Sequence, residues 1–222
     1  VVAVSAGPGM IMSICVGYKL AITLSHLFKK KLFLVDHIEA HILSPKISFN
    51  IEFPFISFVM SGGHCLVILV KAIGNYTLLS STVDDSPGEV FDKIARELNV
   101  GINGGYQLEK LAKTGIIIEE LIIKNVYFKN KRLDYSFSGL KSHYIRAIKS
   151  TTTNPNNIAC TFQHNIALYM IKNLLLIYNK FKLSCPVCLV GGVASNKHIQ
   201  TQFSFEFSRL DVKCYFLSAK YS

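Results

Sequence analysis

Two histidines stand four residues apart in the stretch VDHIEAH, at His37 and His41. On a helix, this spacing lets both imidazole rings face one ion, so the pair is a candidate for two metal ligands. Glu39 does not directly follow the first histidine, as it would in a metalloprotease, and it would face another side of the helix. A metal site needs a third protein ligand, and no spacing in the chain identifies one. Two ordinary histidines on a surface turn are the alternative.

Two glycine-rich turns could bind an anion or a nucleotide. The first is SGGH at residues 61–64, where successive glycines let backbone N–H groups converge on an anion. The second is GGVASN at residues 191–196, between a hydrophobic strand and an amphipathic helix, and its Asn196 could bond a ribose or a base. A plain hairpin turn is the alternative for the first, and a structural strand–helix turn for the second.

A pair of carboxylates lies in the stretch DDSPGEVFDK, at residues 84–93. A helix begins here, with Asp85 or Ser86 as its N-cap. Glu89 and Asp92 then share one helix face at positions i and i+3. Asp92 could accept hydrogen bonds from the hydroxyls of a ribose, whereas a solvated helix face is the default interpretation.

Cys185 and Cys188 form a CPVC motif of the kind that zinc and redox sites use. The chain has six cysteines but no second CxxC, and CPVC continues directly into a hydrophobic strand. We therefore expect core cysteines in a reducing compartment, rather than a metal site or a disulfide scaffold.

An alternation of strands and helices must position these residues. We expect strands at about residues 1–4, 31–36, 53–60, 65–72, 76–83, 185–190 and 212–218. We expect helices ending near residue 27 and at about 37–45, 87–99, 104–115 and 157–182, with residues 116–135 irregular. The longest helix would present Ile166, Met170, Leu174 and Ile177 on one face. Glycine turns at the strand ends make this an α/β pattern with ligand-binding turns.

Composition narrows the class of protein. Half of the 222 residues are hydrophobic and 17% are charged, which excludes a disordered chain. The longest uncharged runs, residues 1–18 and 53–70, are interrupted by Gly and Pro, so neither forms a spanning helix of about 20 apolar residues. We interpret both runs as buried strands joined to tight turns, in a sheet that is covered on both faces.

The net charge is +10, from 24 Lys and Arg against 14 Asp and Glu. This charge favours a polyanionic partner such as RNA, although a nucleotide-biased genome would also enrich Lys, Ile and Asn. No signal peptide is visible and the chain does not begin with Met, so we expect any targeting segment to lie outside it.

Six motifs occur together in a characteristic order and spacing: DHIEAH, FPFISFVMSGGH, DDSPGEVFDKIAR, NGGYQLEKLA, DYSFSGLK and GGVASN. In this combination the chain resembles the universal tRNA adenosine threonylcarbamoyltransferases of the TsaD/Gcp type, formerly described as O-sialoglycoprotein endopeptidases. The details SGGHC and FQHNIA are similar to the mitochondrial branch of the family. The resemblance therefore implies a mitochondrial location.

The resemblance implies an actin-like, sugar-kinase-like α/β fold of two lobes around a nucleotide cleft. Residues 1–50 would be the remainder of the N-terminal lobe, and residues 51–222 the second lobe with a helical insertion. The family's N-terminal ETSCDDT-like motif is absent, and so is its CTDNG segment, whose aspartate supplies a third metal ligand. We therefore expect the chain to be truncated at both ends.

The implied reaction moves a threonylcarbamoyl group from threonylcarbamoyl-adenylate to the exocyclic amine of the tRNA adenosine next to the anticodon, and AMP leaves. The implied partners are tRNA, the adenylate and the synthase that makes it, with a homodimer left open and no membrane. Two other interpretations are a catalytically inactive homologue that binds a nucleotide or a partner, and a sugar-kinase-like phosphotransferase.

The resemblance also assigns residues. His37 and His41 match the family's metal ligands, for one divalent ion of iron or zinc. The matches to its substrate-binding residues are Val59, Met60, Ser61, Gly62, Gly63, Asp92, Gly105 and Asn196. No catalytic nucleophile is assigned. Tyr106 stands where many members have proline after the double glycine. On charge alone, Lys129, Lys131 and Arg132 are candidates for contact with the tRNA backbone.

Overall fold

The computed structural model describes residues 1–101, 103–123, 133–150 and 152–217. The strands are β1 (Val2–Gly7), β2 (Leu32–Asp36), β3 (Phe55–Met60), β4 (Cys65–Ala72), β5 (Asn75–Ser81), β6 (Val187–Val190) and β7 (Cys214–Phe216). The α-helices are α1 (Ile11–Leu27), α2 (His37–Leu43), α3 (Pro45–Ser48), α4 (Pro87–Glu97), α5 (Gly104–Ala112), α6 (Ser138–Ser150), α7 (Pro155–Phe181) and α8 (Lys197–Ser208). Two short 3₁₀ helices, η1 (Glu119–Leu121) and η2 (Gly192–Ser195), complete the described elements.

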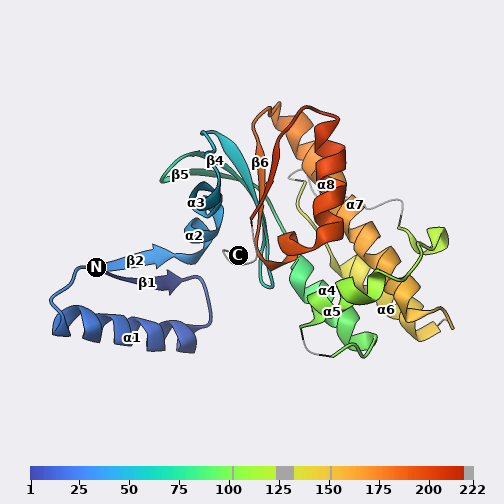
Figure 1. Ribbon diagram of the computed structural model, residues 1–222, viewed down its shortest axis with the longest axis horizontal. Coiled ribbons are helices and arrows are strands. Elements are labelled where there is room, and N and C mark those ends of the chain that lie inside the picture. Colours follow the sequence, from blue (N-terminus) through green and yellow to red (C-terminus); the bar gives the residue numbers. More distant parts are fainter. Residues whose placement is uncertain (102, 124–132, 151, 218–222) are drawn as a thin grey trace.

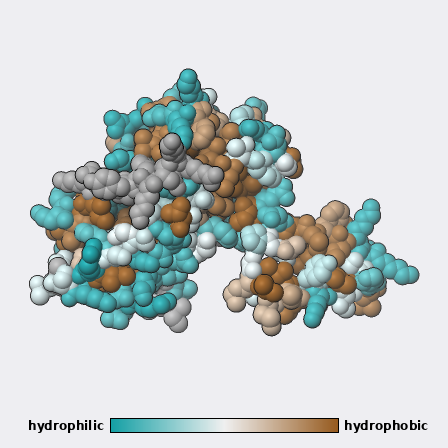
Figure 2. All heavy atoms as spheres, turned by 180° about the vertical axis from the view of Figure 1, so that it is seen from behind, coloured by the Kyte–Doolittle hydropathy of each residue, from teal (hydrophilic) through white to brown (hydrophobic). Residues whose placement is uncertain are grey.

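The first three elements form a small unit of their own, in which β1 and β2 pair in parallel beside α1 (Figure 1). The expectation of a buried first strand is wrong, because the residues of β1 alternate between half-buried and exposed, with no buried position. Apolar side chains also remain exposed on α1, where Ile11 and Met12 are each 77% exposed (Figure 2). A two-stranded sheet with one helix provides too little cover to bury these residues.

A five-stranded sheet in the order β5-β4-β3-β6-β7 forms the centre of the molecule (Figure 1). β3 is antiparallel to β4 and parallel to β6, and β6 is parallel to β7. Every residue of β3 is buried, with Ile56 and Phe58 on one face and Phe55 and Val59 on the other. The second uncharged run thus forms β3 and most of β4, joined by a tight turn, and β3 is covered on both faces, as predicted.

Helices cover both faces of this sheet and confirm the α/β class. On one face lies the larger core, to which α7 contributes a row of residues that are all 0% exposed: Ile166, Met170, Leu174 and Ile177. On the other face, Ile42 of α2 packs into a smaller core with Phe55 and Val59. The predicted lobe boundary at residue 50 stays a prediction, since α2 contacts both β1 and β3.

The helix α6 was not predicted from the sequence. Its buried residues are Leu140, Tyr144 and Ala147, which follow helical spacing at i, i+4 and i+7. Polar and glycine neighbours in the stretch SFSGLKSHY hide this short pattern. Residues 116–135 were predicted to be irregular, and their described parts, 116–123 and 133–135, are so apart from η1 and an isolated bridge at Tyr135.

The ends of β3 and β6 meet at one edge of the sheet because the two strands run in parallel. There the backbone of Gly191, just after β6, lies against Met60, the last residue of β3. A β-carbon at Gly191 would lie 2.4 Å from the carbonyl oxygen of Met60, and the φ of Gly191 is +94°. Both the space and the backbone conformation therefore require glycine at this position.

Replacement of Gly191 by alanine should lower the free energy of unfolding by about 3 kcal/mol, because it combines a steric clash with an unfavourable φ. Gly192→Ala is the matched control, since a β-carbon there would meet no described atom within 4 Å. We expect the control to change stability by about 0.5 kcal/mol or less. Urea denaturation of both variants measures the difference, and equal stability of the two would contradict the close contact at Met60.

A carboxylate fixes the loop before α4 to the loop before α6. Asp84 accepts hydrogen bonds from the hydroxyls of Ser136 at 2.6 Å and Ser138 at 2.8 Å, and from the backbone N–H of Phe137 at 2.7 Å. Burial alone would raise the pKa of Asp84, but these three donors and the backbone N–H of Ser138 outweigh it, and the pKa is lowered. The ionised carboxylate therefore stabilises this junction, which holds the start of α4 in place.

Replacement of Asp84 by asparagine should lower stability at pH 7 by about 1–2 kcal/mol, a figure discounted for the partial exposure of the carboxylate. Because the folded-state pKa is depressed, the contribution of Asp84 is present above the unfolded pKa of about 3.9 and is lost as pH falls through the folded value. The difference between the variant and the parent should therefore narrow below about pH 4. Denaturation curves at pH 7 and pH 3 test this, with the exposed Glu52→Gln as the control.

Candidate functional site

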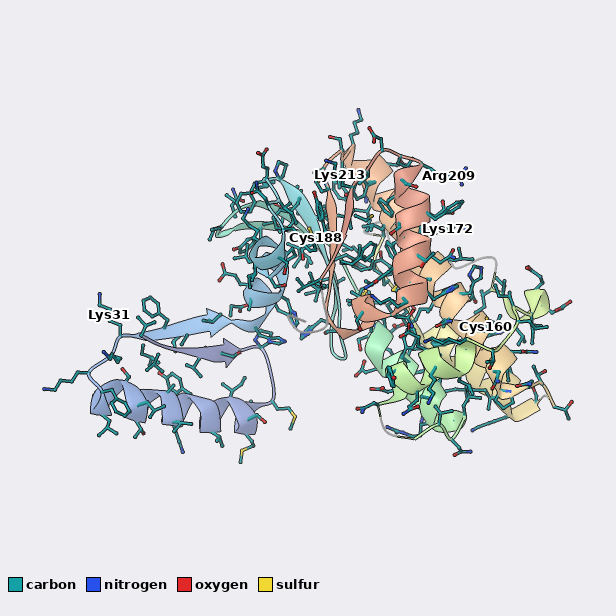
Figure 3. The ribbon with its side chains drawn as sticks, in the orientation of Figure 1. Lys31, Cys160, Lys172, Cys188, Arg209 and Lys213 are labelled. Carbon is teal, nitrogen blue, oxygen red and sulfur yellow. The ribbon has the colours of Figure 1, made fainter. Side chains whose placement is uncertain are left out.

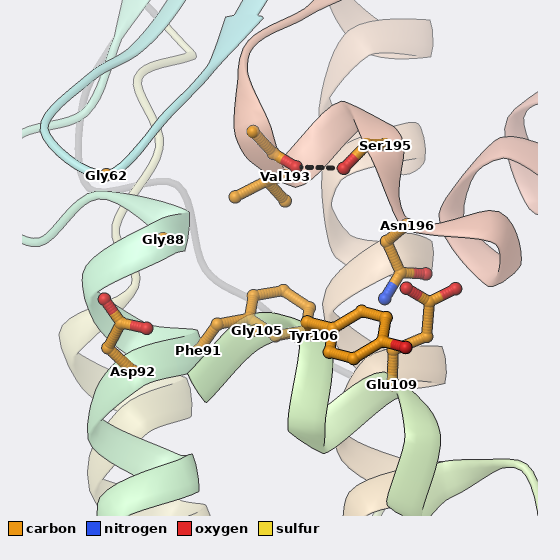
Figure 4. Close-up of a pocket in the computed structure, with 11 residues that line it drawn as sticks. Gly62, Gly88, Phe91, Asp92, Gly105, Tyr106, Glu109, Val193, Ser195 and Asn196 are labelled. Atoms are coloured by element: carbon orange, nitrogen blue, oxygen red, sulfur yellow. Dashed lines mark hydrogen bonds between the residues drawn. The ribbon is translucent and has the colours of Figure 1, made fainter. Parts of the chain in front are cut away.

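A cavity of about 290 Å³ opens at the edge of the sheet where β3 and β6 end. It lies among α4, α5 and the turn that leads into α8 (Figure 4). Its lining residues are Gly62, Gly88, Phe91, Asp92, Gly105, Tyr106, Glu109, Gly192, Val193, Ser195 and Asn196. Four of the predicted substrate-binding residues thus meet in one pocket, although they are up to 134 positions apart in the chain (196 − 62 = 134).

Two glycines allow the walls of the pocket to approach one another. A β-carbon at Gly88, in the first turn of α4, would lie 2.7 Å from the Cα atom of Gly62. A β-carbon at Gly104, at the start of α5, would lie 2.8 Å from Oδ1 of Asp92. Neither glycine was predicted as part of the site, because a close approach of two backbones leaves no mark in the sequence of either segment.

The predicted cap of α4 also belongs to this construction. Ser86 accepts the N–H of Glu89, and the Glu89 carboxylate accepts the N–H of Ser86, which together form a capping box. The Ser86 hydroxyl also donates to the carbonyl oxygen of Gly62 at 2.6 Å. One buried serine therefore fixes both the start of α4 and the glycine turn.

The two carboxylates that share a face of α4, Glu89 and Asp92, have separate roles. Glu89 caps the helix, while Asp92 lines the pocket.

Backbone groups remain open toward the cavity at three glycines. At Gly62, Gly105 and Gly192 a β-carbon would meet no described atom within 4 Å, and all three line the pocket. These positions differ from Gly88, Gly104 and Gly191, whose missing side chains are needed for packing. Glycines with open backbone are the kind that let a ligand approach the main chain closely.

Asn196 joins the pocket to α8. Its side-chain oxygen accepts the N–H of Ile199 at 3.0 Å and so caps the helix, and its amide donates to Oε1 of Gln163 at 3.3 Å. Asn196 is 5% exposed, and the terminal amide has a second N–H that can serve a ligand in the pocket. Its Oδ1 is already engaged as the helix cap.

The other predicted substrate-binding residues do not line the cavity. Val59 and Met60 are 0% exposed in β3 and support the turn from below. The hydroxyl oxygen of Ser61 accepts the N–H groups of Gly63 at 3.3 Å and His64 at 3.0 Å, so these groups stabilise the turn itself. In this conformation Gly62 is the residue of the SGGH turn that reaches the pocket.

The two histidines of HIEAH lie one turn apart on α2, with His37 as its first residue and His41 in its last turn. The centroids of the His37 and His41 rings are 4.6 Å apart and the rings are nearly perpendicular. His64, the last residue of the SGGH turn, has its ring centroid 6.3 Å from that of His37. Burial lowers the pKa of His41, and the neighbouring charges of His37 and then His64 lower it further. A neutral imidazole is the form that binds a metal ion.

Two of these histidines fit part of a metal site. The described residues contain no group of three or more His, Cys, Asp or Glu side chains arranged to hold a metal ion. His64 was not predicted to lie here, because only the fold brings the SGGH turn next to α2. The turn thus faces the histidines at one end and the pocket at the other, through His64 and Gly62.

Glu39 points away from the histidines, as its position between them predicts. It accepts the hydroxyl of Tyr76 at 2.5 Å, and the Tyr76 oxygen in turn accepts the N–H of Gly74 at 2.8 Å. Burial raises the pKa of Tyr76, and the hydrogen bond to Glu39 raises it further. α2 is therefore tied to the β4–β5 hairpin on the side opposite its metal-ligand candidates.

Glu109 and Tyr106 were missed as pocket residues. Both lie on α5 with Gly105, and the i to i+4 spacing of Gly105 and Glu109 would have placed the carboxylate near the predicted glycine. Oε1 of Glu109 accepts the N–H of Lys197 at 2.8 Å, next to the cap of α8. α5 and α8 are thus joined across the pocket by this bond.

Of the CPVC cysteines, Cys188 is a core residue, as predicted, whereas Cys185 is half-buried and packs against the larger core. Cys188 is 0% exposed within β6 (Figure 3), and burial raises its pKa to about 12, with smaller effects from Cys214 and Cys185. All six cysteines, each in a described part of the chain, are free.

The predicted tRNA contacts Lys129, Lys131 and Arg132 lie outside the described residues. In the described parts, no helix is both long and apolar enough to cross a bilayer.

Comparisons with known proteins agree on one family. The family model of tRNA N6-adenosine threonylcarbamoyltransferases, TsaD, matches residues 1–222. A protein of that name from Sulfurihydrogenibium sp. is 39% identical over 196 residues, covering 88% of this chain and 58% of the relative. Another from Persephonella marina is 35% identical over 216 residues, covering 97% of this chain and 62% of the relative. The chain thus spans about three fifths of the length of these relatives.

The fold is similar to that of HypF from T. kodakarensis, with a TM-score of 0.69 at 16% identity, over 96% of this chain and 37% of the other. A HypF structure in a phosphate- and nucleotide-bound form gives a TM-score of 0.67 at 13% identity, over 96% of this chain and 42% of that one. At such identity the likeness concerns the fold, which is α/β of the actin-like type. The chain belongs to the TsaD family of tRNA N6-adenosine threonylcarbamoyltransferases.

Proposed function

We propose that the protein transfers a threonylcarbamoyl group from threonylcarbamoyl-adenylate to the exocyclic amine of the tRNA adenosine next to the anticodon, with release of AMP. The observation that carries this proposal is the convergence of Gly62, Asp92, Gly105 and Asn196 on one cavity. The cavity volume of about 290 Å³ lies close to the lower end of the range for small-molecule sites. The family membership supplies the reaction class.

The side chains of the pocket fit the parts of an adenylate. The carboxylate of Asp92 can accept hydrogen bonds from ribose hydroxyls, and the open backbone at Gly62 can approach a phosphate. The donor is a mixed anhydride that is already activated, and AMP is a good leaving group. The protein therefore has to orient the donor beside the tRNA amine and needs no covalent nucleophile.

His37 and His41 are proposed as ligands of one divalent ion, iron or zinc. Their adjacent rings and the lowered pKa of His41 support this role. When bound, the ion would supply Lewis-acid polarisation of oxygens on the donor. The His64 ring lies close to His37 and ends the turn that also reaches the pocket, which supports a role of this pair beside the proposed adenylate site.

The proposed partners are tRNA and the synthase that makes the adenylate. The net charge of +10 supports a polyanionic substrate. A mitochondrial location is proposed on the similarity of SGGHC and FQHNIA to the mitochondrial branch. Homodimer formation is proposed on the resemblance alone.

Transfer of labelled threonine to tRNA, in the presence of the synthase, ATP and bicarbonate, tests the function directly. We expect labelling by the parent protein, none by the His37→Ala/His41→Ala double variant, and at least tenfold less by Asp92→Ala. His26→Ala, at an exposed histidine of α1, is the matched control and should label normally.

Other outcomes of this experiment separate the alternatives. Nucleotide binding without transfer by the parent would identify an inactive homologue. Sugar-dependent ATP hydrolysis that persists in the double variant would identify a phosphotransferase. Full labelling by the double variant would contradict the role of the histidines.

Metal binding has a readout independent of catalysis. At a free Zn²⁺ concentration of 100 times Kd, the parent should gain about 2.7 kcal/mol of stability, because the ion binds the folded state. His37→Ala and His41→Ala should each lose this gain, whereas His26→Ala should keep it. Thermal unfolding with and without Zn²⁺ or Fe²⁺ measures the effect, and an equal gain in all variants would place the metal elsewhere.

A further inference from the structure

Tyr106 presents an unusually open aromatic ring to the pocket. It lies in the first turn of α5, lines the cavity, and is 68% exposed. Figure 4 shows its ring extending across the pocket from α5 toward Glu109 and Asn196, with Val193 and Ser195 beyond. Single exposed apolar side chains are common on protein surfaces, but this ring lines a cavity, so it is a candidate for contact with a ligand.

The position of Tyr106 has no evident role in stability. α5 is anchored in the core by Gly104, Leu108 and Ala112, all buried. Tyr106 points away from these residues, on the side of the helix that faces the cavity. Removal of its ring therefore leaves the packing of α5 intact, which allows a clean test by substitution.

The second aromatic residue of the pocket cannot offer a ring face. Phe91 is 3% exposed, and its ring packs edge-to-face against Phe162 at a centroid distance of 5.0 Å. The side chains of Asp92, Glu109 and Asn196 are polar, so they suit hydroxyl and amino groups of a ligand and not a flat apolar ring. Tyr106 is thus the lining residue with a ring surface free for a planar apolar group.

We propose that Tyr106 is the stacking platform for the nucleobase of the nucleotide bound in this pocket, an assignment that rests on the proposed function. A base has an apolar face that stacks favourably on an aromatic ring whatever its hydrogen-bonding edge. The carboxylate of Asp92 on α4 and the open backbone of Gly62 then remain available for ribose and phosphate. Stacking by Tyr106 sets a preference for the large purine ring over a pyrimidine.

Isothermal titration of the protein with AMP, CMP and ribose 5-phosphate tests the assignment. Tyr106→Ala should weaken AMP binding about tenfold, because one base–aromatic contact is lost. Tyr106→Phe keeps the ring and should stay within about twofold of the parent. Binding of ribose 5-phosphate, measured by competition, should be the same in the parent and in both Tyr106 variants because this ligand has no base.

The result that overturns the assignment is AMP affinity of Tyr106→Ala within twofold of the parent, or an equal loss for AMP and ribose 5-phosphate. Asp92→Asn separates this failure from failure of the proposed function. If Asp92→Asn weakens AMP binding while Tyr106→Ala does not, only the stacking role of Tyr106 is contradicted. If the parent protein binds no AMP, both the stacking role and the proposed function are contradicted. Unchanged thermal unfolding of Tyr106→Ala confirms that lost affinity is not lost folding.

Discussion

The site depends on glycines that contact distant segments where no side chain would fit. Gly191 lies against Met60, Gly88 against Gly62, and Gly104 against Asp92, each closer than a β-carbon would allow. These contacts bring the ends of two parallel strands and the starts of two helices to one edge of the sheet. Dispersion and hydrogen bonds of the large core then hold the arrangement, but the core alone would not set these distances. The pocket is the space left between the segments that these glycine contacts hold together.

The SGGH turn couples this pocket to the histidines. Ser61 stabilises the turn from within, and Ser86 fixes it from outside through the carbonyl of Gly62. Because the turn is held at both points, the position of His64 follows from that of Gly62. A ligand that contacts Gly62 therefore has a fixed position relative to the rings of His37, His41 and His64. The proposed function requires such a linkage, because in it the pocket and the histidine pair act on one donor molecule.

The sequence predicted what local patterns determine. β3, the Ser86 cap and the apolar face of α7 follow from hydrophobic spacing and capping chemistry, and all three are confirmed. α6 was missed because its three buried residues lie among polar ones, and the exposure of β1 was missed because hydrophobicity does not say what covers a strand. His64 reaches α2 only through a tertiary contact, so no periodicity identifies it, whereas Tyr106 directly follows the predicted Gly105 in the sequence.

The orientation of the histidine pair depends on a contact with the far hairpin. Asp36 caps α2 by accepting the N–H of Glu39, and the Glu39 side chain accepts the hydroxyl of Tyr76. A helix of seven residues has little stability of its own. These two hydrogen bonds and the burial of Ile42 therefore determine the position and orientation of α2. Tyr76 belongs to β5, an edge strand of the central sheet, and the ends of other strands of this sheet form the pocket. The bond between Glu39 and Tyr76 therefore fixes the orientation of the His37 and His41 rings relative to that sheet.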